Sequence, residues 1–262
     1  MAAIPNGVAA YNPGTFVLIT ATFFMFYLYA APGVRMGALS NLPMVHFATH
    51  DSFAAGQNEP THQPVKIDSL HRAMPNLTYI RPCDGEEVIG AWMLALGKTT
   101  SPLLLSLRRD AVTPMNYTDQ YKVAKGPYVL GEVTNAKLIL ASCGTNLHYA
   151  VATAETLTAD GILTRVVSCP NFEHFDKQDR AYQESVLPHD GTLIISVEEY
   201  IATTWARYVT ASIGITGWGY SASNTSNYEL LGLNCKGIQK RVLRYLTSLA
   251  GQYSRKAEWC SI

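Results

Sequence analysis

Short apolar stretches alternate with amphipathic ones along most of the chain, from residue 43 onward. The apolar stretches, such as LPMVHFATH at 42–50 and PLLLSLRR at 102–109, have the length and composition of buried strands. Between them, DGEEVIGAWMLALGK at 84–98 has the pattern of a helix, with Asp84 placed as its N-cap. Strands that are apolar throughout are typical of parallel sheets covered by helices on both faces. The alternation therefore predicts an α/β fold.

The alternation stops once and then restarts. Residues 113–126 have few apolar runs and mixed charge, and they contain or adjoin two prolines, so we expect an interdomain linker there. Strand and helix patterns resume after it and include TTWARYVTASIG at 203–214, which is predicted to be a helix. The sequence thus predicts two three-layer α/β domains with mainly parallel sheets, at 1–112 and 127–262.

The first 34 residues carry no charge, and TFVLITATFFMFYLYAA at 15–31 is almost wholly apolar. A signal peptide is disfavoured because no basic region precedes the stretch. A membrane-spanning helix would be at the short limit and would lack a basic flank to orient it. A helix buried at a subunit interface accounts for the same residues. Only 15% of the residues in the chain are charged, which fits a large interface.

Charge and cysteine usage exclude several classes. Basic and acidic residues balance at 20 each, so nothing supports binding to nucleic acid or to an acidic membrane. Five widely spaced cysteines without a C-x-x-C pair argue against a disulfide framework or a cysteine-rich zinc site. The cysteine pattern favours a reducing compartment, and we expect a cytoplasmic protein.

Two histidines, His50 and His62, stand near the two ends of the loop HDSFAAGQNEPTHQP. A metal site held by this chain is disfavoured. His50 and His62 are too far apart to share a helix turn, and no cysteine lies near them. His46 and His50 would be roughly 13 Å apart on a strand. No G-x-S-x-G or Walker sequence occurs either. Loops after parallel strands gather ligands, and imidazoles there can transfer protons near neutral pH. Loop histidines that only cap backbone groups explain the same pattern, and spacing alone leaves both interpretations open.

The motifs flanking this loop resemble a known family. THDSFAAGQNEPTHQP and RAMPNLTYIRPCDGEEV resemble the pyrimidine-binding domain of transketolases, and TFFMFYLYAAP is similar to a helix of the subgroup that includes dihydroxyacetone synthase. FDKQDRAYQESVLP, SVEEYIATTWARYV and YELLGLNCKGIQKRV resemble successive parts of the family's C-terminal domain. The resemblance implies a partial pyrimidine-binding domain at 1–112 and a transketolase C-terminal domain at 127–262.

The resemblance also implies chemistry and site residues. It implies an enzyme that uses thiamine diphosphate to move a two-carbon ketol unit between sugars or small aldehydes, with Mg²⁺ and the diphosphate held by a separate domain. By position, Phe23, Phe26 and Tyr29 would pack against the pyrimidine ring of the cofactor, which turns the apolar stretch into a buried wall. His50 and His62 would handle hydroxyl protons of the donor and acceptor.

Substrate contacts follow from the same resemblance, with three departures. Arg109 matches the arginine that pairs with the phosphate of sugar phosphates. The family's loop commonly reads Gly-Glu-Asp-Gly-Pro-Thr-His, whereas residues 56–62 read GQNEPTH. Asn58 therefore stands where an aspartate accepts a hydrogen bond from the donor sugar, and Glu59 replaces a glycine. Arg108 stands where the family usually has serine, and no role follows for its charge. We expect an altered substrate.

Met1 aligns with the last residue of the family's Arg-Glu-His-Ala-Met motif, so the glutamate that activates the pyrimidine would precede it. One hypothesis is a split enzyme, active as a homo- or hetero-oligomer with a subunit that supplies the diphosphate domain, the metal and this glutamate. A second is a non-catalytic remnant or regulatory partner. A third is a truncated chain or a misassigned start codon. No nucleic-acid or membrane partner is expected.

Overall fold

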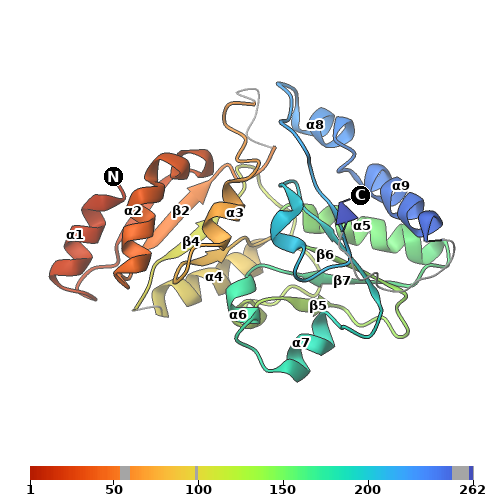
Figure 1. The fold of residues 1–262 in the computed structure, drawn as a ribbon, viewed down its shortest axis with the longest axis horizontal. Coiled ribbons are helices and arrows are strands. Elements are labelled where there is room, and N and C mark those ends of the chain that lie inside the picture. Colours follow the sequence, from red (N-terminus) through yellow and green to blue (C-terminus); the bar gives the residue numbers. More distant parts are fainter. Residues whose placement is uncertain (54–59, 98–99, 250–259, 262) are drawn as a thin grey trace.

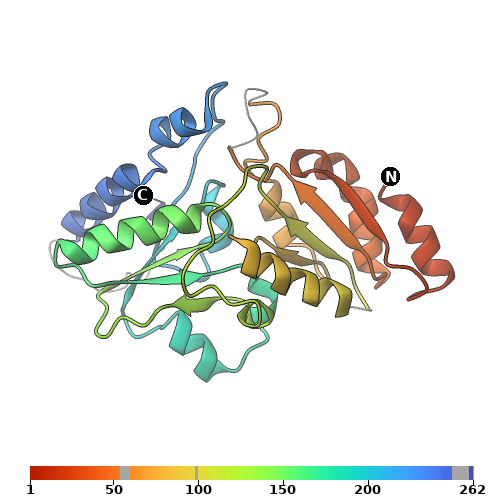
Figure 2. The same ribbon diagram turned by 180° about the vertical axis from the view of Figure 1, so that it is seen from behind.

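The computed structural model describes residues 1–53, 60–97 and 100–249, together with the backbone of 260–261. Two sheets lie side by side, with α1 and α2 at one end of the molecule and α8 and α9 at the other (Figure 1). Helices cover both faces, and α4 and α5 lie in front of the sheets when the molecule is seen from behind (Figure 2). The predicted fold class is confirmed.

The first sheet has the strand order β1-β2-β4-β3, and all its described pairings are parallel. Its elements are α1 (Ala3–Tyr11), β1 (Ile19–Phe23), η1 (Phe24–Phe26), α2 (Tyr27–Leu39), β2 (Val45–Thr49), α3 (Ile67–Arg72), β3 (Thr78–Ile80), α4 (Gly85–Gly97) and β4 (Leu103–Ser106). Side chains alternate between two cores, as strand geometry requires. Val45 and Leu105 pack on the side of α4, whereas Ala48 and Leu104 pack on the side of α2 and α3.

The second sheet has the strand order β10-β9-β8-β6-β7-β5, with only β5 antiparallel among the described pairs. Its elements are β5 (Tyr128–Leu130), β6 (Leu138–Ser142), α5 (Asn146–Ala159), β7 (Thr164–Ser168), α6 (Phe172–Phe175), α7 (Arg180–Val186), β8 (Leu193–Val197), η4 (Ala202–Trp205), β9 (Ala211–Ile213), α8 (Asn224–Leu230), α9 (Cys235–Ser248) and β10 (Cys260–Ser261). Leu138 and Leu140 of β6 face α5 and α9, and Ile139 faces the opposite core.

The apolar stretch 15–31 is not the single helix that its composition suggested. Its first half forms β1, which pairs in parallel with β2, and α2 starts only at Tyr27. Ile19, Thr20 and Thr22 are β-branched and suit a pleated surface better than a helix. Within the described residues, no helix has the length and apolarity needed to cross a bilayer.

The predicted helix at 203–214 is also wrong. The segment forms the short η4 and then β9, which pairs with β8 in parallel. Val209 and Thr210 are β-branched, and both are buried beside the sheet. Hydrogen bonding to β8 therefore overrides the helical pattern of the sequence in this segment.

Residues 113–126, predicted as a linker, pack closely on the first domain. The segment contains η3 (Lys122–Lys125), and Val123 is fully buried in the core beside α4. The carbonyl of Gln120 lies so near α4 that a Cβ at Gly90 would come within 2.3 Å of it. Glycine is therefore required at position 90 for this segment to reach the helix.

Candidate active site at the carboxyl ends of the first sheet

Four of the residues singled out in the sequence come together where β1 and β2 end. The parallel register sets Phe23 opposite Thr49, so His50 follows directly beside the Phe23 ring. The two rings stack with centroids 3.6 Å apart and planes 26° apart. The His62 ring meets Phe26 edge-on at 5.6 Å and Phe23 at 6.2 Å. The cluster thus presents two imidazoles next to an aromatic surface.

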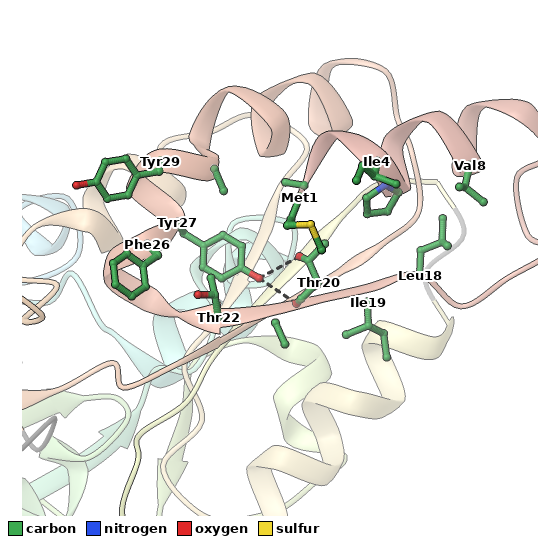
Figure 3. A pocket seen from close by; sticks show the side chains of 14 residues that line it. Met1, Ile4, Val8, Leu18, Ile19, Thr20, Thr22, Phe26, Tyr27 and Tyr29 are labelled. Atoms are coloured by element: carbon green, nitrogen blue, oxygen red, sulfur yellow. Dashed lines mark hydrogen bonds between the residues drawn. The ribbon is translucent and has the colours of Figure 1, made fainter.

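The aromatic surface continues along one side of η1 and α2. The Phe26 ring lies 5.9 Å from that of Phe23 and 6.2 Å from that of Tyr29, so the three-residue spacing places all three rings in one row. Phe26 and Tyr29 border a groove of about 590 Å³ between α1, β1 and α2 (Figure 3). Tyr27 also lines the groove, and its hydroxyl contacts the Thr20 hydroxyl and carbonyl, each at 3.0 Å. Tyr29 is 75% exposed and therefore available to a ligand or partner.

His50 has an unusual backbone and a neutral side chain. Its φ of 58° lies in the left-handed region, which a histidine adopts at an energetic cost. Its Nδ1 and the Thr49 hydroxyl form a hydrogen bond of 2.9 Å. Burial, followed by the charge of Arg109, lowers the pKa of His50 below 6.5, although Asp110 opposes the shift. The imidazole is therefore mainly unprotonated at neutral pH and can accept a proton.

Of the two predicted substrate-binding residues, Arg109 is among the described residues and Asn58 is not. Arg109 follows β4, is exposed, and lies near enough for its charge to act on His50. Asn58, with Glu59, lies outside the described residues. The structure therefore brings Arg109 to the same sheet edge as the histidine and aromatic cluster.

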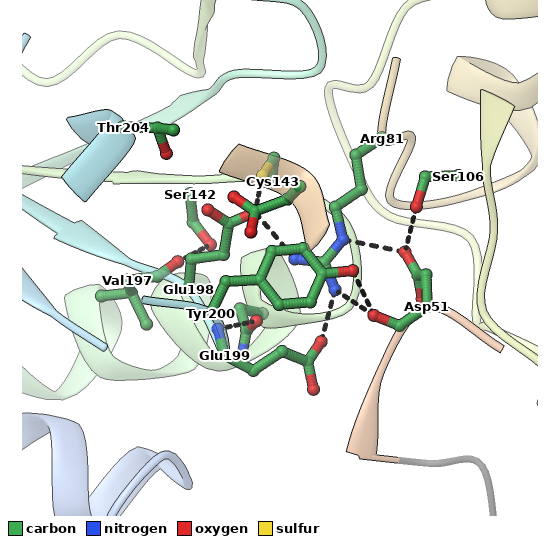
Figure 4. A network of polar contacts seen from close by, with 12 residues as sticks. Asp51, Arg81, Ser106, Ser142, Cys143, Val197, Glu198, Glu199, Tyr200 and Thr204 are labelled. Atoms are coloured by element: carbon green, nitrogen blue, oxygen red, sulfur yellow. Dashed lines mark hydrogen bonds and ion pairs between the residues drawn. The ribbon is translucent and has the colours of Figure 1, made fainter. Parts of the chain in front are cut away.

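A buried ionic network holds the loop that begins at His50 (Figure 4). Arg81, which follows β3, is fully buried and pairs with Asp51 at 2.8 Å, Glu198 at 2.9 Å and Glu199 at 2.5 Å. Glu199 also accepts a hydrogen bond of 3.1 Å from the backbone N–H of Phe53. Two of these carboxylates follow β8, so the second domain fixes the histidine loop of the first.

Backbone and aromatic groups tighten the same contact. The Tyr200 hydroxyl donates a hydrogen bond to the Asp51 carbonyl, and the Arg81 guanidinium lies over the Tyr200 ring at 4.2 Å. Gly144, with φ of 55°, passes close to Arg81, where a Cβ would come within 2.7 Å of Nε. Sequence reasoning missed this network. The available signal was charge directly after apolar strands, in YIRP and SVEE.

A second guanidinium extends the network. Arg72 pairs with both oxygens of Glu198 at 2.8 Å and with Asp68 at 3.0 Å. Burial raises the pKa of Asp68 to about 7, whereas burial of Glu198 is outweighed by Arg72 and its pKa is held at about 2. The Arg72 charge is therefore balanced mainly by the Glu198 carboxylate, with which it forms two hydrogen bonds.

His46 does not belong to the cluster. It is fully buried in β2, and its Nδ1 lies 2.7 Å from the Thr20 hydroxyl. Burial lowers its pKa to about 4. Within the part of the chain that the structure describes, no group of three or more metal-ligating side chains forms.

The two domains match two parts of one family. Residues 1–114 match the model of the transketolase pyrimidine-binding domain, and residues 126–234 match that of the transketolase-like C-terminal domain. A dihydroxyacetone synthase of Pichia angusta is 41% identical over 248 residues, which are 94% of this chain and 35% of that protein. The chain thus spans about a third of the length of the curated relatives it matches.

Solved structures give the same result. Transketolase from Pichia stipitis, in complex with sedoheptulose 7-phosphate, matches with a TM-score of 0.92 and 34% identity, over 98% of this chain and 38% of that one. A split-gene transketolase, described as an inactive β4 tetramer, shares the fold at 20% identity with a TM-score of 0.74, over 93% of this chain and 80% of that one. Since both domains and nearly the whole length align with transketolases, this chain belongs to the transketolase family.

Proposed function

We propose that this chain is the pyrimidine-binding and C-terminal part of a transketolase-like enzyme that transfers a two-carbon ketol unit between sugars or small aldehydes. The observation that carries the proposal is the cluster of Phe23, His50, Phe26 and His62 at the carboxyl ends of β1 and β2. Family membership supports the reaction class, because the relatives are dihydroxyacetone synthases and transketolases.

The residues present fit the pyrimidine half of thiamine diphosphate. A flat heteroaromatic ring needs an apolar wall against which it can stack, and Phe23, Phe26 and Tyr29 form such a row beside an open groove. When bound, the cofactor supplies the electron sink that ketol transfer requires. The chain's own share is to hold and orient this ring and to keep water from one side of it.

Proton transfer falls to the two histidines. His50 is mainly neutral at pH 7 and lies at the end of the aromatic row, so it can accept a proton from a substrate hydroxyl. His62 meets the same row edge-on from the far end of the loop and can serve the second substrate. Arg109 would pair with a substrate phosphate through its fork of donors. The Asn58 side-chain oxygen would accept a hydrogen bond from a sugar hydroxyl.

We infer that another chain supplies the diphosphate domain, Mg²⁺ and the activating glutamate. The surface that supports this inference is an apolar face around α1, β1 and α2, whose exposed side chains include Ile4, Tyr11, Phe16, Val17, Ile19, Leu28 and Tyr29. β1 is the edge strand of its sheet, and the groove of 590 Å³ opens on this face. Exposed apolar area of this kind is typical of a subunit interface. The split-gene neighbour provides a precedent for division of the fold between chains.

Reconstitution tests the proposal. The chain is co-expressed with a separate transketolase diphosphate domain, and the purified complex is supplied with thiamine diphosphate, Mg²⁺ and a ketol donor. We expect consumption of the donor that depends on both chains, measured by coupled assay. A stable complex that binds the cofactor and consumes no ketol donor would contradict the catalytic proposal. Such a result would support a second candidate, a non-catalytic partner, which the altered residues Asn58 and Glu59 favour.

Phe26→Ala tests the aromatic row directly. Removal of one stacking ring should raise the dissociation constant of thiamine diphosphate in the reconstituted complex by about tenfold, since an aromatic pair and its buried area contribute on the order of 1–2 kcal/mol. Isothermal titration calorimetry measures the change. Tyr121→Ala is the matched control, because that ring is 68% exposed and lies in the segment between the domains. Equal cofactor affinity in both variants would show that the row does not bind the ring.

A further inference from the structure

A separate small cavity lies between the loop after β4 and the N-terminus of α5. Its volume is about 230 Å³, and Arg108, Thr145, His148 and Tyr149 line it together with residues 111–113. Arg108 is the residue for which the family resemblance left no role. The cavity therefore combines an unassigned cation with the first turn of a fourteen-residue helix.

Thr145 occupies the N-cap position of α5 without capping it. A threonine there ordinarily has an extended backbone and accepts a hydrogen bond from the first turn. Here φ is −55° and ψ is −35°, which is helical, and the side chain makes no capping bond. The residue is only 4% exposed, and its hydroxyl oxygen has no hydrogen-bond partner among the described residues. A buried hydroxyl in this state costs stability unless a ligand or water satisfies it.

Among the described residues, Arg108 also has an unsatisfied hydrogen-bond donor and only a weak ion pair. Its side chain is 23% exposed, and Nη2 lies 3.8 Å from Asp110, at the limit of an ion pair. The Asp110 carboxylate accepts a shorter hydrogen bond, of 2.7 Å, from the amide of Asn224. Nε of Arg108 is buried and has no partner in the part of the chain that is described. An arginine stays charged in proteins, so this N–H favours an anionic acceptor.

His148 adds a third polar atom to the same cavity. Its Nε2 is buried and is also without a partner among the residues that the structure places. Burial, followed by Arg108, lowers the pKa of this imidazole. The neighbouring carboxylate of Asp84 is occupied by the Met115 N–H at 3.0 Å and the Thr118 hydroxyl at 2.7 Å. Arg108 and the positive end of α5 supply the positive charge at the cavity, and the Asp84 carboxylate acts on His148 in the opposite sense.

We propose that this cavity binds phosphate, either inorganic phosphate or the terminal phosphate of a small phosphomonoester. The Arg108 guanidinium and the Thr145 hydroxyl would donate to its oxygens, and Nε2 of the neutral His148 ring would accept a hydrogen bond from a protonated phosphate oxygen. The start of α5 would stabilise its negative charge. The volume holds a phosphate with a short substituent and is below that of ordinary drug-sized pockets. The site differs from the proposed substrate site, where Arg109 acts beside His50.

Such a ligand would connect the two domains. Arg108 and Arg109 are adjacent in the loop after β4, whereas Thr145 and His148 belong to the second domain. A phosphate bound between them would hold the Arg109 loop against α5. The inference does not depend on the catalytic proposal, because it concerns binding by this chain alone.

The test is titration of the complete 262-residue chain with inorganic phosphate, followed by calorimetry and by backbone amide NMR of α5. We expect saturable binding that shifts the first-turn amides. Arg108→Ser should raise the dissociation constant on the order of tenfold or more, since hydrogen bonds to charged groups contribute about 1.5–3 kcal/mol. Thr145→Val should raise it about fivefold. Arg207→Ser, the matched control, should leave it unchanged, because that side chain is 71% exposed and pairs with Asp176 away from the cavity.

A parallel titration with glycerol phosphate separates the two sources, because tighter binding than that of inorganic phosphate identifies a phosphomonoester. Melting temperatures check that each variant is folded, and Arg108→Lys, which keeps the charge and removes Nε, replaces Arg108→Ser if the latter unfolds. The proposal is overturned if the wild-type chain shows no saturable phosphate binding. It is equally overturned if Arg108→Ser weakens binding no more than Arg207→Ser does.

Discussion

Arg81→Met is expected to destabilise the chain more than any other single substitution considered. The change removes the guanidinium that pairs with Asp51, Glu198 and Glu199, all buried. Glu198 keeps its pair with Arg72, whereas Asp51 and Glu199 lose the one cation that pairs with them among the described residues. Breaking a buried pair by removal of one partner costs about 3–5 kcal/mol. Methionine retains most of the side-chain volume, so the loss is mainly electrostatic. Urea unfolding followed by circular dichroism and by tryptophan fluorescence measures it in the isolated chain.

Arg207→Met is the control for this experiment. Arg207 also pairs with a carboxylate, that of Asp176 at 2.8 Å, but its side chain is 71% exposed. A solvated pair contributes about 0.2–1 kcal/mol, so its loss should barely shift the urea midpoint. If Arg81→Met proves as mild as Arg207→Met, the network does not hold the domains together. The His50 loop must then be positioned by other contacts.

His62→Ala is expected to have the largest effect on catalysis. In the reconstituted complex, loss of a proton-transferring group should lower kcat by about 10²–10⁴-fold. The affinity for thiamine diphosphate should change little, since His62 meets Phe26 and Phe23 only edge-on. Steady-state kinetics with saturating cofactor, combined with calorimetry, separates the two quantities.

His189→Ala controls for the removal of an imidazole. His189 is about half exposed and contacts Glu184 at 3.1 Å on the surface of the second domain, after α7. We expect no change of kcat in this variant. A kcat that His62→Ala leaves within twofold of the wild type would show that His62 transfers no proton in the limiting step. His62 would then be an ordinary polar residue of its loop.

Most of the fold could be predicted from local pattern. Strands such as LILAS at 138–142 and helices such as α4, capped by Asp84, follow from apolar periodicity and end signals. The two errors, at 15–31 and at 203–214, fall on segments where β-branched residues pair with a strand distant in the sequence. Local pattern indicates that a segment will be buried. It does not indicate which edge of a sheet is free to accept it.

Some features of the candidate site could likewise be predicted from the sequence, and others depend on the tertiary structure. The family resemblance singled out Phe23, Phe26 and Tyr29 from the sequence. Phe23 ends the strand β1 and Phe26 lies in η1, so only the structure showed that the three rings form a row. The sequence by itself placed His50 directly after a strand. Only the tertiary structure decided that this histidine stacks on Phe23, because their contact depends on the parallel register of β1 with β2. Likewise Arg81 meets Glu198 across 117 residues, and only chain folding brings together charges so far apart in the sequence.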